Sequence, residues 1–549
     1  MSTVPIETGA AALVAELERA GIELVFGLPG VHNLAVWAAL ARSDIRLVGV
    51  RHEQTAVYAA DGLARATGGV GVALTTTGPG AANAVAATGE AWASKSPVVV
   101  IATDIATTLR RPSVYRGVLH ETRDQAAMFR PVSKRAFVVR SGAEVASVLR
   151  AAIATALSPP AGPVYVGIPT DVLTQLAGGV EPVDLPEPEW APPAVDDGEL
   201  RRAVAMIDTA RRPVVWAGGG VVRAGAGPAV AALAERIGAP VLETYAARGA
   251  IRPGSPGWVG LPPHVPEAGR LWDDADLVIA IGSDLDGMMT QNWRMPAPAS
   301  FLAINVDADD AVKNYQGAVV VGDARQVCEL LLQAVAPSPE QAEARWDLEE
   351  LRVRAWTAIE DDAPTAVEFL RGLAEGLPAD AFVAADMCIP GYWTGAFHPF
   401  PLPRRLAYPV GWGTLGFAFP ASLGAALSGT GPTLCVCGDG GFLFACGELA
   451  TVAQEQIPVT ILLTDDGGYG VLRYDQLAAG EESVGVDLLT PDWLALAGSF
   501  GIEAERVPSL DALGASLRTR LESERPSLLV LEESLKPPVT TSARWHRAA

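Results

Sequence analysis

The segment 434–442 reads LCVCGDGGF, an apolar run that stops at an acid flanked by glycines. The apolar part predicts a buried strand, and the part from Gly438 through Asp439 to Gly440 and Gly441 predicts a turn that opens a helix. The amino end of a helix favours anions, and glycines let backbone amides approach phosphate oxygens. A carboxylate is tolerable there mainly when a cation lies between it and the anion. We therefore predict that Asp439 is a metal ligand beside a bound phosphate group.

A second strand end of the same kind follows in the next apolar run, 459–464, which leads into Asp465, Asp466 and a glycine pair. Carboxyl ends of neighbouring parallel strands meet at one edge of an open sheet, where such sheets bind their ligands. Asp439 and Asp466 could share one hard divalent cation there, with oxygen ligands completed by a phosphate and a backbone carbonyl. An isolated Gly-Asp-Gly is more often a simple tight turn, so the interpretation depends on the rest of the chain.

Short β-branched runs alternate with Ala- and Leu-rich helical stretches along most of the 549 residues, which indicates parallel sheets covered by helices. We expect an α/β protein with three doubly wound parallel-sheet domains at residues 1–177, 196–336 and 364–549. A proline-rich acidic segment, 178–197, separates the first two, and a charged segment, 337–363, separates the last two. The strands are predicted at 24–26, 46–50, 70–74, 98–101, 164–167, 213–217, 277–281, 301–306, 381–385, 434–437, 459–464 and 528–532.

The composition limits the classes of partner. A formal net charge of −22 repels nucleic acids and anionic membrane surfaces. No apolar run is long and uninterrupted enough to cross a bilayer, and the amino end shows no secretory pattern. The five cysteines are odd in number, which favours a reducing compartment. We expect a cytoplasmic enzyme that acts on small molecules and binds neither nucleic acid nor membrane.

The two acidic strand ends together resemble the thiamine diphosphate motif, in which Gly-Asp-Gly is followed by a doubled asparagine. Gly413-Thr414-Leu415-Gly416 and an amino-terminal Glu53 match further elements of that superfamily, in its order and over nearly the whole chain. The chain is thus similar to the 2-oxo acid decarboxylases and carboligases, in particular acetolactate synthase and benzoylformate decarboxylase. The resemblance implies a pyrimidine-binding domain, a central domain and a diphosphate-binding domain, in that order.

The resemblance also assigns residues to thiamine diphosphate and to Mg²⁺ or another divalent cation. It implies metal ligands at Asp439, at Asp466 and at the Gly468 carbonyl. It implies cofactor contacts at those residues and at Glu53, Gly78, Asn83, Asp386, Gly413, Leu415, Gly438, Gly440, Gly441, Tyr469, Gly470 and Val471. Aspartates stand at 465 and 466 where the family has asparagines, which adds negative charge beside a diphosphate.

Three residues are candidates for the chemistry itself. In proteins similar to this one, the glutamate that matches Glu53 hydrogen-bonds the pyrimidine ring, although a single acid would equally suit a helix amino end. His120, in Leu119-His120-Glu121, is a candidate proton shuttle because imidazole titrates near neutral pH. His32 is a candidate substrate contact, and the alternative is a loop histidine with only a structural role.

These residues favour decarboxylation of a small 2-oxo acid with carboligation of the product to a second carbonyl, as in acetolactate synthase. One alternative is a simple decarboxylase of the benzoylformate decarboxylase type. Another is a degenerate structural or regulatory subunit, suggested by Asp465 and Asp466 in place of asparagines. Flavin (FAD) stays open, because the cluster from Gly218 to Gly220 is only a weak dinucleotide signal. The resemblance implies a homodimer or tetramer, since the glutamate-bearing and metal-bearing domains of the superfamily meet across a subunit boundary.

Overall fold

The computed structural model describes residues 8–111, 114–177, 192–409 and 411–539. It contains three separate sheets, and all pairings between their named strands are parallel. The prediction of an α/β protein with three doubly wound parallel sheets is confirmed. The domain limits stay predictions, and most of the segment 178–197 lies outside the described residues.

The N-terminal sheet has six strands in the order β2-β1-β3-β4-β6-β5. They are β1 (Leu24–Gly27), β2 (Arg46–Gly49), β3 (Gly71–Thr75), β4 (Val98–Asp104), β5 (Arg135–Val138) and β6 (Val164–Pro169). The helices of one face share one core and are α1 (Gly9–Arg19), α2 (Leu34–Leu40), α6 (Val145–Leu157) and α7 (Thr170–Thr174). The other helices contribute to a second core and are α3 (Glu53–Thr67), α4 (Pro79–Ala93) and α5 (Gln125–Phe129).

The central sheet has five strands in the order β11-β10-β9-β7-β8. They are β7 (Pro213–Ala217), β8 (Val241–Glu243), β9 (Leu277–Ile281), β10 (Phe301–Asn305) and β11 (Ala318–Val321). The helices of this part are α8 (Asp197–Thr209), α9 (Gly219–Arg223), α10 (Gly227–Ile237), α11 (Pro266–Asp273), α12 (Ala308–Val312) and α13 (Ala324–Ala334). Two further helices lead toward the last sheet and are α14 (Ala342–Trp346) and α15 (Leu348–Asp362).

The C-terminal sheet has six strands in the order β13-β12-β14-β15-β17-β16. They are β12 (Phe382–Ala385), β13 (Leu406–Ala407), β14 (Thr433–Gly438), β15 (Val459–Thr464), β16 (Glu503–Arg506) and β17 (Ser527–Leu531). The helices are α16 (Pro364–Gly376), α17 (Ile389–Phe397), α18 (Ala418–Leu427), α19 (Asp439–Phe442), α20 (Leu449–Glu455), α21 (Gly470–Ala478), α22 (Trp493–Ser499) and α23 (Leu510–Glu522).

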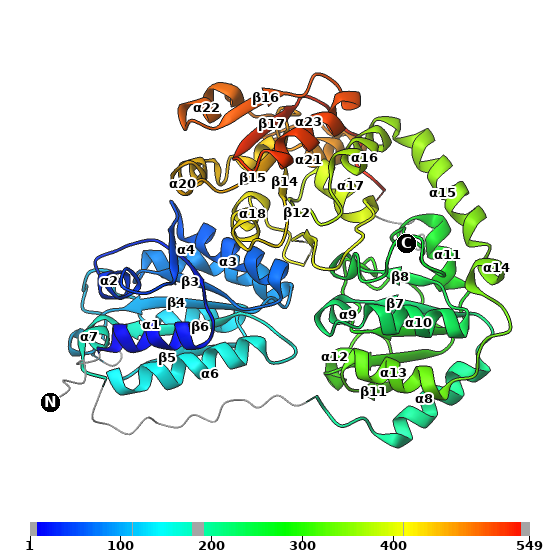
Figure 1. Cartoon of the computed structure of the whole chain (residues 1–549), viewed down its shortest axis with the longest axis horizontal. Coiled ribbons are helices and arrows are strands. Elements are labelled where there is room, and N and C mark those ends of the chain that lie inside the picture. Colours follow the sequence, from blue (N-terminus) through cyan, green and yellow to red (C-terminus); the bar gives the residue numbers. More distant parts are fainter. Residues whose placement is uncertain (1–7, 112–113, 178–191, 410, 540–549) are drawn as a thin grey trace.

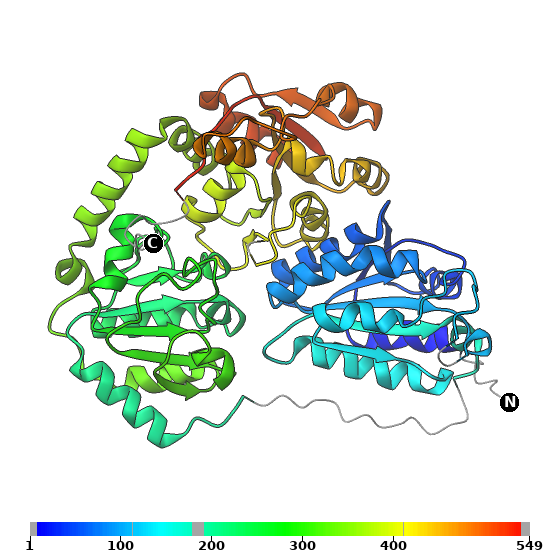
Figure 2. The same ribbon diagram turned by 180° about the vertical axis from the view of Figure 1, so that it is seen from behind.

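The two faces of the C-terminal sheet belong to two different cores. Cys435 and Cys437 of β14 lie in the core that also contains α3 and α4 of the N-terminal domain. Leu434 and Val436 of the same strand lie in the core shared with the central domain. Because side chains alternate across a strand, one strand serves both cores. Figures 1 and 2 show the result, with the C-terminal domain above the other two and in contact with both.

Helices α3 and α18 hold the N-terminal and C-terminal domains together at close range. A Cβ on Gly424 of α18 would overlap the carbonyl oxygen of Ala59, and one on Gly62 of α3 would overlap that of Ala421. Glycine is therefore required at both positions for the two backbones to approach.

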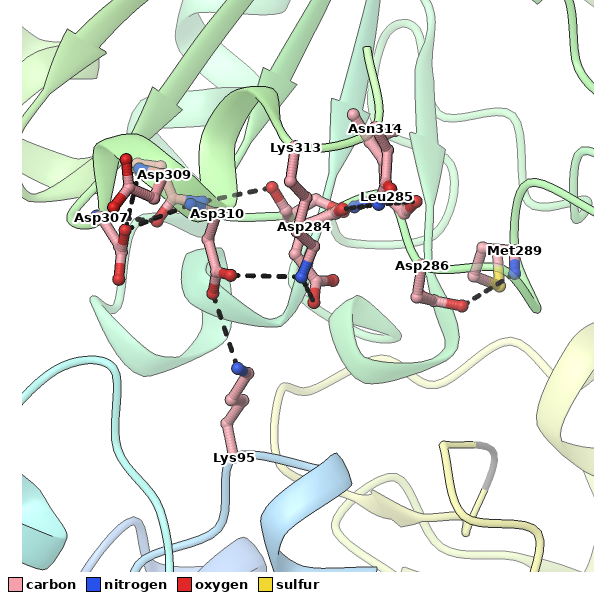
Figure 3. A network of polar contacts seen from close by, with 12 residues as sticks. Lys95, Asp284, Leu285, Asp286, Met289, Asp307, Asp309, Asp310, Lys313 and Asn314 are labelled. Atoms are coloured by element: carbon pink, nitrogen blue, oxygen red, sulfur yellow. Dashed lines mark hydrogen bonds and ion pairs between the residues drawn. The ribbon is translucent and has the colours of Figure 1, made fainter. Parts of the chain in front are cut away.

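A polar network joins the N-terminal and central domains (Figure 3). Lys95 Nζ lies 3.5 Å from Asp310 Oδ2, and Lys313 binds both Asp310 and Asp284. Within the described ranges, no helix combines the length and apolar character needed to cross a membrane.

Candidate active site

Asp439 begins α19, directly after β14. The last residue of that strand, Gly438, pairs with Thr464 at the end of β15, so the Asp439 turn and the 465–470 loop start side by side. Asp439 is 1% exposed, and its Oδ1 accepts a hydrogen bond from the Gly440 amide at 2.8 Å. Its buried Oδ2 has no hydrogen-bond partner among the described residues. Burial raises the pKa of Asp439 to about 7, and the charge of Asp466 adds to this effect.

The two aspartates of the next loop have different environments. Asp466 Oδ1 is buried without a hydrogen-bond partner in the described part of the chain. Burial raises the pKa of Asp466, and Arg473 opposes this effect. Asp465, in contrast, is bonded through both oxygens: Oδ2 accepts from Trp493 Nε1 at 2.6 Å, and Oδ1 from the Gly467 amide at 3.2 Å. Asp465 therefore fixes the loop, while Asp439 and Asp466 keep oxygens free for a cation.

The Gly468 carbonyl approaches the Asp439 turn from this neighbouring loop. A Cβ on Gly440 would lie 3.4 Å from the Gly468 oxygen and 2.7 Å from the Tyr469 ring. Arg473 of α21 donates to the backbone oxygens of Asp466 and Gly467, both at 3.0 Å, which holds the loop where Gly470 and Val471 begin that helix. The described residues contain no group of three or more His, Cys, Asp or Glu side chains that could hold a metal ion. The turn instead offers two carboxylates and a carbonyl, a donor set that suits a hard cation also bound by phosphate.

Asp386 organises a second group of loops behind this turn. It follows β12, is 1% exposed, and accepts hydrogen bonds from the amides of Gly416 at 2.9 Å and Met387 at 3.1 Å. A Cβ on Gly441 would lie 2.5 Å from Asp386 Oδ2. Burial raises the pKa of Asp386 to about 6 against these amide hydrogen bonds. Asp386 thus ties the 413–416 segment, with exposed Gly413 and half-buried Leu415, to the Asp439 turn.

Glu53 lies at the carboxyl edge of the N-terminal sheet, as the first residue of α3. It is 6% exposed, and its Oε2 accepts a hydrogen bond from Asn83 Nδ2 of α4 at 2.9 Å. A Cβ on Gly80 would lie 3.1 Å from Glu53 Oε1. The structure therefore brings together Glu53, Asn83 and the 78–80 loop, which the sequence analysis gave as separate cofactor contacts.

His32 and His120 lie on the other side of the same loop. Their Nδ1 atoms are 3.3 Å apart, and both rings are half-buried. Gly78, with φ +62°, contacts the His120 backbone: a Cβ there would lie 2.5 Å from the His120 oxygen. The Gly78 amide donates to Gln125 Oε1 at 2.7 Å, which anchors the loop to a buried side chain.

Two separate groups of predicted residues thus form, one at the carboxyl edge of the N-terminal sheet and one at that of the C-terminal sheet. Among the described residues, no hydrogen bond or ion pair joins the Glu53 group to the Asp439 group. Close to Glu53, Glu448 of the C-terminal domain instead accepts hydrogen bonds from the amides of Arg51 at 2.9 Å and His52 at 3.1 Å.

Sequence reasoning missed Glu448, and also the bond between Asp465 and Trp493. Each partner lies far along the chain from the motif it supports, and neither has a local pattern of its own. The sequence analysis also assigned no role to Gln125, which anchors the Gly78 amide.

Comparison with known proteins agrees with this geometry. Three family descriptions match in order: the N-terminal TPP binding domain of thiamine pyrophosphate enzymes at residues 7–128, their central domain at 200–331, and their C-terminal TPP binding domain at 388–531. The chain belongs to the thiamine pyrophosphate enzyme family. The resemblance drawn from the motifs is confirmed, and the chain is a thiamine pyrophosphate-dependent enzyme of the decarboxylase and carboligase type.

Its curated relatives include both kinds of catalyst. A probable 2-ketoarginine decarboxylase of Pseudomonas aeruginosa is 35% identical over 96% of this chain and 94% of the relative. A probable acetolactate synthase large subunit of Methanocaldococcus jannaschii is 32% identical, covering 95% and 91%. The acetolactate synthase isozyme 3 large subunit of Escherichia coli is 32% identical, covering 95% and 94%. Family membership favours an enzyme over the degenerate subunit.

Proposed function

We propose that this enzyme decarboxylates a small 2-oxo acid with thiamine diphosphate and Mg²⁺ or a similar divalent cation. The observation that carries the proposal is the pair of buried oxygens, Asp439 Oδ2 and Asp466 Oδ1, that lack partners in the described part of the chain. Buried carboxylate oxygens are costly when unpaired, so a cation at this turn accounts for them. The Gly468 carbonyl supplies a third ligand.

The residues at the edges of the N-terminal and C-terminal sheets have different roles in this proposal. When bound, the cofactor supplies the carbon nucleophile and the electron sink that let a carboxylate depart as carbon dioxide. Asp439, Asp466 and Gly468 hold the cation and through it the diphosphate. Glu53, oriented by Asn83, would contact the heterocycle through its carboxyl group, and half-buried Leu415 would pack against the cofactor. Asp386 holds the Gly416 and Gly441 backbones that surround the diphosphate.

Two outcomes then compete. Carboligation to a second carbonyl is supported by the acetolactate synthase relatives, and release after simple decarboxylation by the 2-ketoarginine decarboxylase relative. Calorimetry with thiamine diphosphate and MgCl₂ tests the cofactor. Carbon dioxide release and product analysis on pyruvate, benzoylformate, glyoxylate and 2-ketoarginine test the reaction. We expect binding only with a divalent cation, and carbon dioxide from at least one of these acids. No binding with any divalent ion would favour the subunit interpretation.

We also propose that two chains complete each site, one supplying Glu53 and the other the Asp439 turn. Large apolar side chains are exposed at both edges, among them Val31 (68% exposed) and Leu119 (65%) beside the histidines, and Phe444 (59%) and Leu472 (51%) beside the metal loops. Unpaired apolar surface of this kind fits a subunit interface.

Mixing two variants tests this arrangement, at a thiamine diphosphate concentration too low to activate Asp439→Asn. Glu53→Gln and Asp439→Asn chains, exchanged at equal amounts, form mixed dimers in which one of the two sites is intact. We expect activity to return to about a quarter of the wild-type value from statistical pairing. Each variant mixed with itself is the control. Activity that stays at the level of the single variants would place the whole site within one chain.

Flavin and location stay predictions. The glycine segment at Gly219 and Gly220 lines a cavity of about 420 Å³ among the three domains, together with cationic Arg223 and Arg404 and anionic Asp284. An absorbance spectrum of the purified protein decides whether FAD is bound. Residence in the cytoplasm is supported by the five cysteines, all of which are free.

A further inference from the structure

A carboxylate of the C-terminal domain binds the backbone that leads into Glu53. Glu448 Oε1 accepts hydrogen bonds from the Arg51 amide at 2.9 Å and from the His52 amide at 3.1 Å. Oε2 accepts a further hydrogen bond from the Arg51 amide at 3.1 Å. These amides belong to the two residues that directly precede Glu53, the first residue of α3. The end of the turn between β2 and α3 therefore finds its acceptor in a different domain.

The side chains of this turn are exposed. Arg51 and His52 both face a cavity of about 120 Å³, which Glu448 also lines. The Arg51 guanidinium donates to Gln454 Oε1 at 2.8 Å, so it binds the C-terminal domain separately from the turn backbone. Because exposed side chains beside a cavity restrain a backbone weakly, the position of the turn depends mainly on the hydrogen bonds to Glu448.

Glu448 itself is held in one orientation. Its side chain is 2% exposed, and the Thr451 hydroxyl donates to Oε2 at 2.5 Å. Burial raises the pKa of Glu448, and hydrogen bonds from Thr451 and from the Arg51 amide oppose this effect. A buried carboxylate that accepts from several donors is a rigid acceptor.

The segment that carries Glu448 is continuous with the Asp439 turn. Backbone hydrogen bonds run from the Leu443 amide to Asp439 at 3.2 Å, from the Ala445 amide to Phe442 at 3.0 Å, and from the Glu448 amide to Ala445 at 2.9 Å. These successive turns give the Glu448 carboxylate a fixed place relative to the C-terminal sheet.

Glu53 thus has two supports of different kinds. Asn83 Nδ2 donates to Glu53 Oε2 at 2.9 Å and fixes the side chain. Glu448 fixes the backbone from which that side chain leaves. A displacement of about 1 Å in a group that acts on a reacting molecule can cost about 100-fold in rate. The backbone contact therefore matters for catalysis although Glu448 does not touch the Asn83 side of the group.

We propose that Glu448 is a positioning residue that sets where the Glu53 carboxyl meets the cofactor. It does so by accepting hydrogen bonds from the two amides that precede Glu53. The proposal rests on the proposed function, in which Glu53 contacts the heterocycle. Glu448 acts as an acceptor of fixed geometry, and its own proton takes no part. Its role concerns kcat, whereas the affinity for the cofactor depends on Asp439 and Asp466.

Three substitutions separate the acceptor from the volume and the charge of Glu448. Glu448→Leu fills a similar volume but accepts no hydrogen bond. Glu448→Gln loses the charge, yet its carbonyl oxygen can accept from both amides, as Oε1 does in the wild type. Thr451→Val keeps Glu448 and removes only the hydroxyl that orients it. Gln454→Ala is the matched control, because Gln454 joins the same two segments through the Arg51 side chain.

We expect Glu448→Leu to lower kcat about 100-fold and Thr451→Val to lower it about 5-fold. Glu448→Gln and Gln454→Ala should keep most of the wild-type kcat. The affinity for thiamine diphosphate with MgCl₂, measured by calorimetry, should be the same in all four variants. Hydrogen exchange of the backbone at 49–55, measured by mass spectrometry in the cofactor-free protein, should be faster in Glu448→Leu and unchanged in Glu448→Gln.

A double variant tests whether the effect passes through Glu53. In the Glu53→Gln background, Glu448→Leu should lower kcat no further, because the carboxyl that it positions is already absent. A further loss of similar size would overturn the positioning role. A loss of cofactor affinity as large as the loss of kcat in Glu448→Leu would overturn it too, and so would a Glu448→Gln enzyme as slow as Glu448→Leu.

Urea denaturation checks that each variant folds. Should Glu448→Leu not fold, Thr451→Val in the wild-type and Glu53→Gln backgrounds takes its place, and a Thr451→Val enzyme with the wild-type kcat would overturn the proposal. A wild-type protein that releases no carbon dioxide from any 2-oxo acid would instead contradict the proposed function. Unchanged hydrogen exchange at 49–55 in Glu448→Leu would contradict the positioning role alone.

Discussion

The N-terminal and C-terminal domains have the same sheet but different edges. Numbered within each domain, the strands of both follow the order 2-1-3-4-6-5. The carboxyl edge of the first carries Glu53, Asn83 and two histidines, with hydrogen bonds between neutral or singly charged groups. The carboxyl edge of the second carries Asp386, Asp439 and Asp466 among glycines. The same topology thus carries a hydrogen-bonded Glu53 group in the N-terminal domain, and in the C-terminal domain an acidic, glycine-rich edge where we propose that the cation and diphosphate bind.

The difference teaches that the sheet fixes where a ligand binds, and the loops fix what it is. Open α/β sheets offer a ligand site beyond the carboxyl ends of their strands whatever those ends contain. The central sheet has the related order 2-1-3-4-5, but its edge carries neither the Glu53 group nor the Asp439 group. Variants at the N-terminal edge should therefore lower kcat, whereas variants at the C-terminal edge should lower the affinity for the cofactor.

The largest effect is expected at the N-terminal edge. Glu53→Gln should lower kcat about 1000-fold, because the variant cannot exchange a proton with the heterocycle. The affinity for thiamine diphosphate, measured by calorimetry, should change little because the diphosphate edge is intact. Asn83→Ala offers a milder comparison, since it removes only the partner of Glu53 Oε2. If Glu53→Gln lowered the cofactor affinity as much as kcat, the two edges would not have the separate roles proposed here.

The contacts of the C-terminal domain with its two neighbours should differ in their response to acid. On the central side, His264 and Phe397 lie 6.3 Å apart between ring centroids, and burial lowers the pKa of His264 and His398 to about 4. The unfolded chain binds these protons below about pH 6.5, and the folded chain only near pH 4. Stability is therefore complete above pH 6.5 and is lost as the pH falls toward 4, by about 3 kcal/mol for each histidine.

Urea denaturation of wild type and His264→Asn between pH 4 and 7 measures this effect. The variant should lose less stability on acidification than the wild type. Parallel pH curves for the two proteins would show that His264 does not titrate with unfolding. Among the described residues of the N-terminal contact, made through α3 and α18, no histidine is buried, so this contact should not lose stability for the same reason.

At the C-terminal edge, Asp439→Asn should weaken cofactor and Mg²⁺ binding about 100-fold, equivalent to roughly 2.7 kcal/mol. The variant removes one charged ligand and leaves Asp466 and the Gly468 carbonyl. Calorimetry with the diphosphate and metal together measures the change, and saturating cofactor should restore much of kcat. Asp465→Asn is the matched variant, because Asp465 is bonded to Trp493 and leaves the cation ligands intact. Similar losses in both would mean that the two aspartates share the cation.

The smallest effect concerns the junction of the two domains. Gly424→Ala should lower the free energy of unfolding by about 2 kcal/mol, because the added methyl overlaps the Ala59 carbonyl and forces α3 and α18 apart. Urea denaturation measures the loss. Gly429→Ala tests a nearby glycine with open space around it but with φ +67°, so only backbone strain should appear there. A larger loss at Gly429 than at Gly424 would contradict the close packing of the helices.

The strands that sequence reasoning found and those it missed differ in position. The strands missed were β5, β8, β11, β13 and β16. All five are edge strands. Interior strands such as β4 are buried along their whole length and read as continuous apolar runs, whereas β16 has two exposed residues and two half-buried ones. An edge strand has one neighbour, so it can be polar, like β16, or very short, like the two residues of β13 and the three of β8, and its signal in the sequence is weaker.

The site shows the same division. Asp439, Asp466 and Glu53 could be singled out as candidates because each follows an apolar run, where the local pattern marks the turn and the residue type suggests the chemistry. Their supports could not be predicted in the same way. Glu448 meets Arg51 from 397 positions away, and Trp493 meets Asp465 from 28 positions away.

By itself, the sequence determined the fold class and the thiamine diphosphate family, and it predicted the residues that would hold the cofactor, because these depend on short runs and on the chemistry of single side chains. Only the tertiary structure decided that His32 and His120 lie in contact, that Asp465 is bonded to Trp493 and Gly467, and that one sheet shares its faces with two domains. The physical reason is that such contacts arise from the packing of distant segments, and packing energy depends on all the surfaces brought together and not on any one stretch of chain.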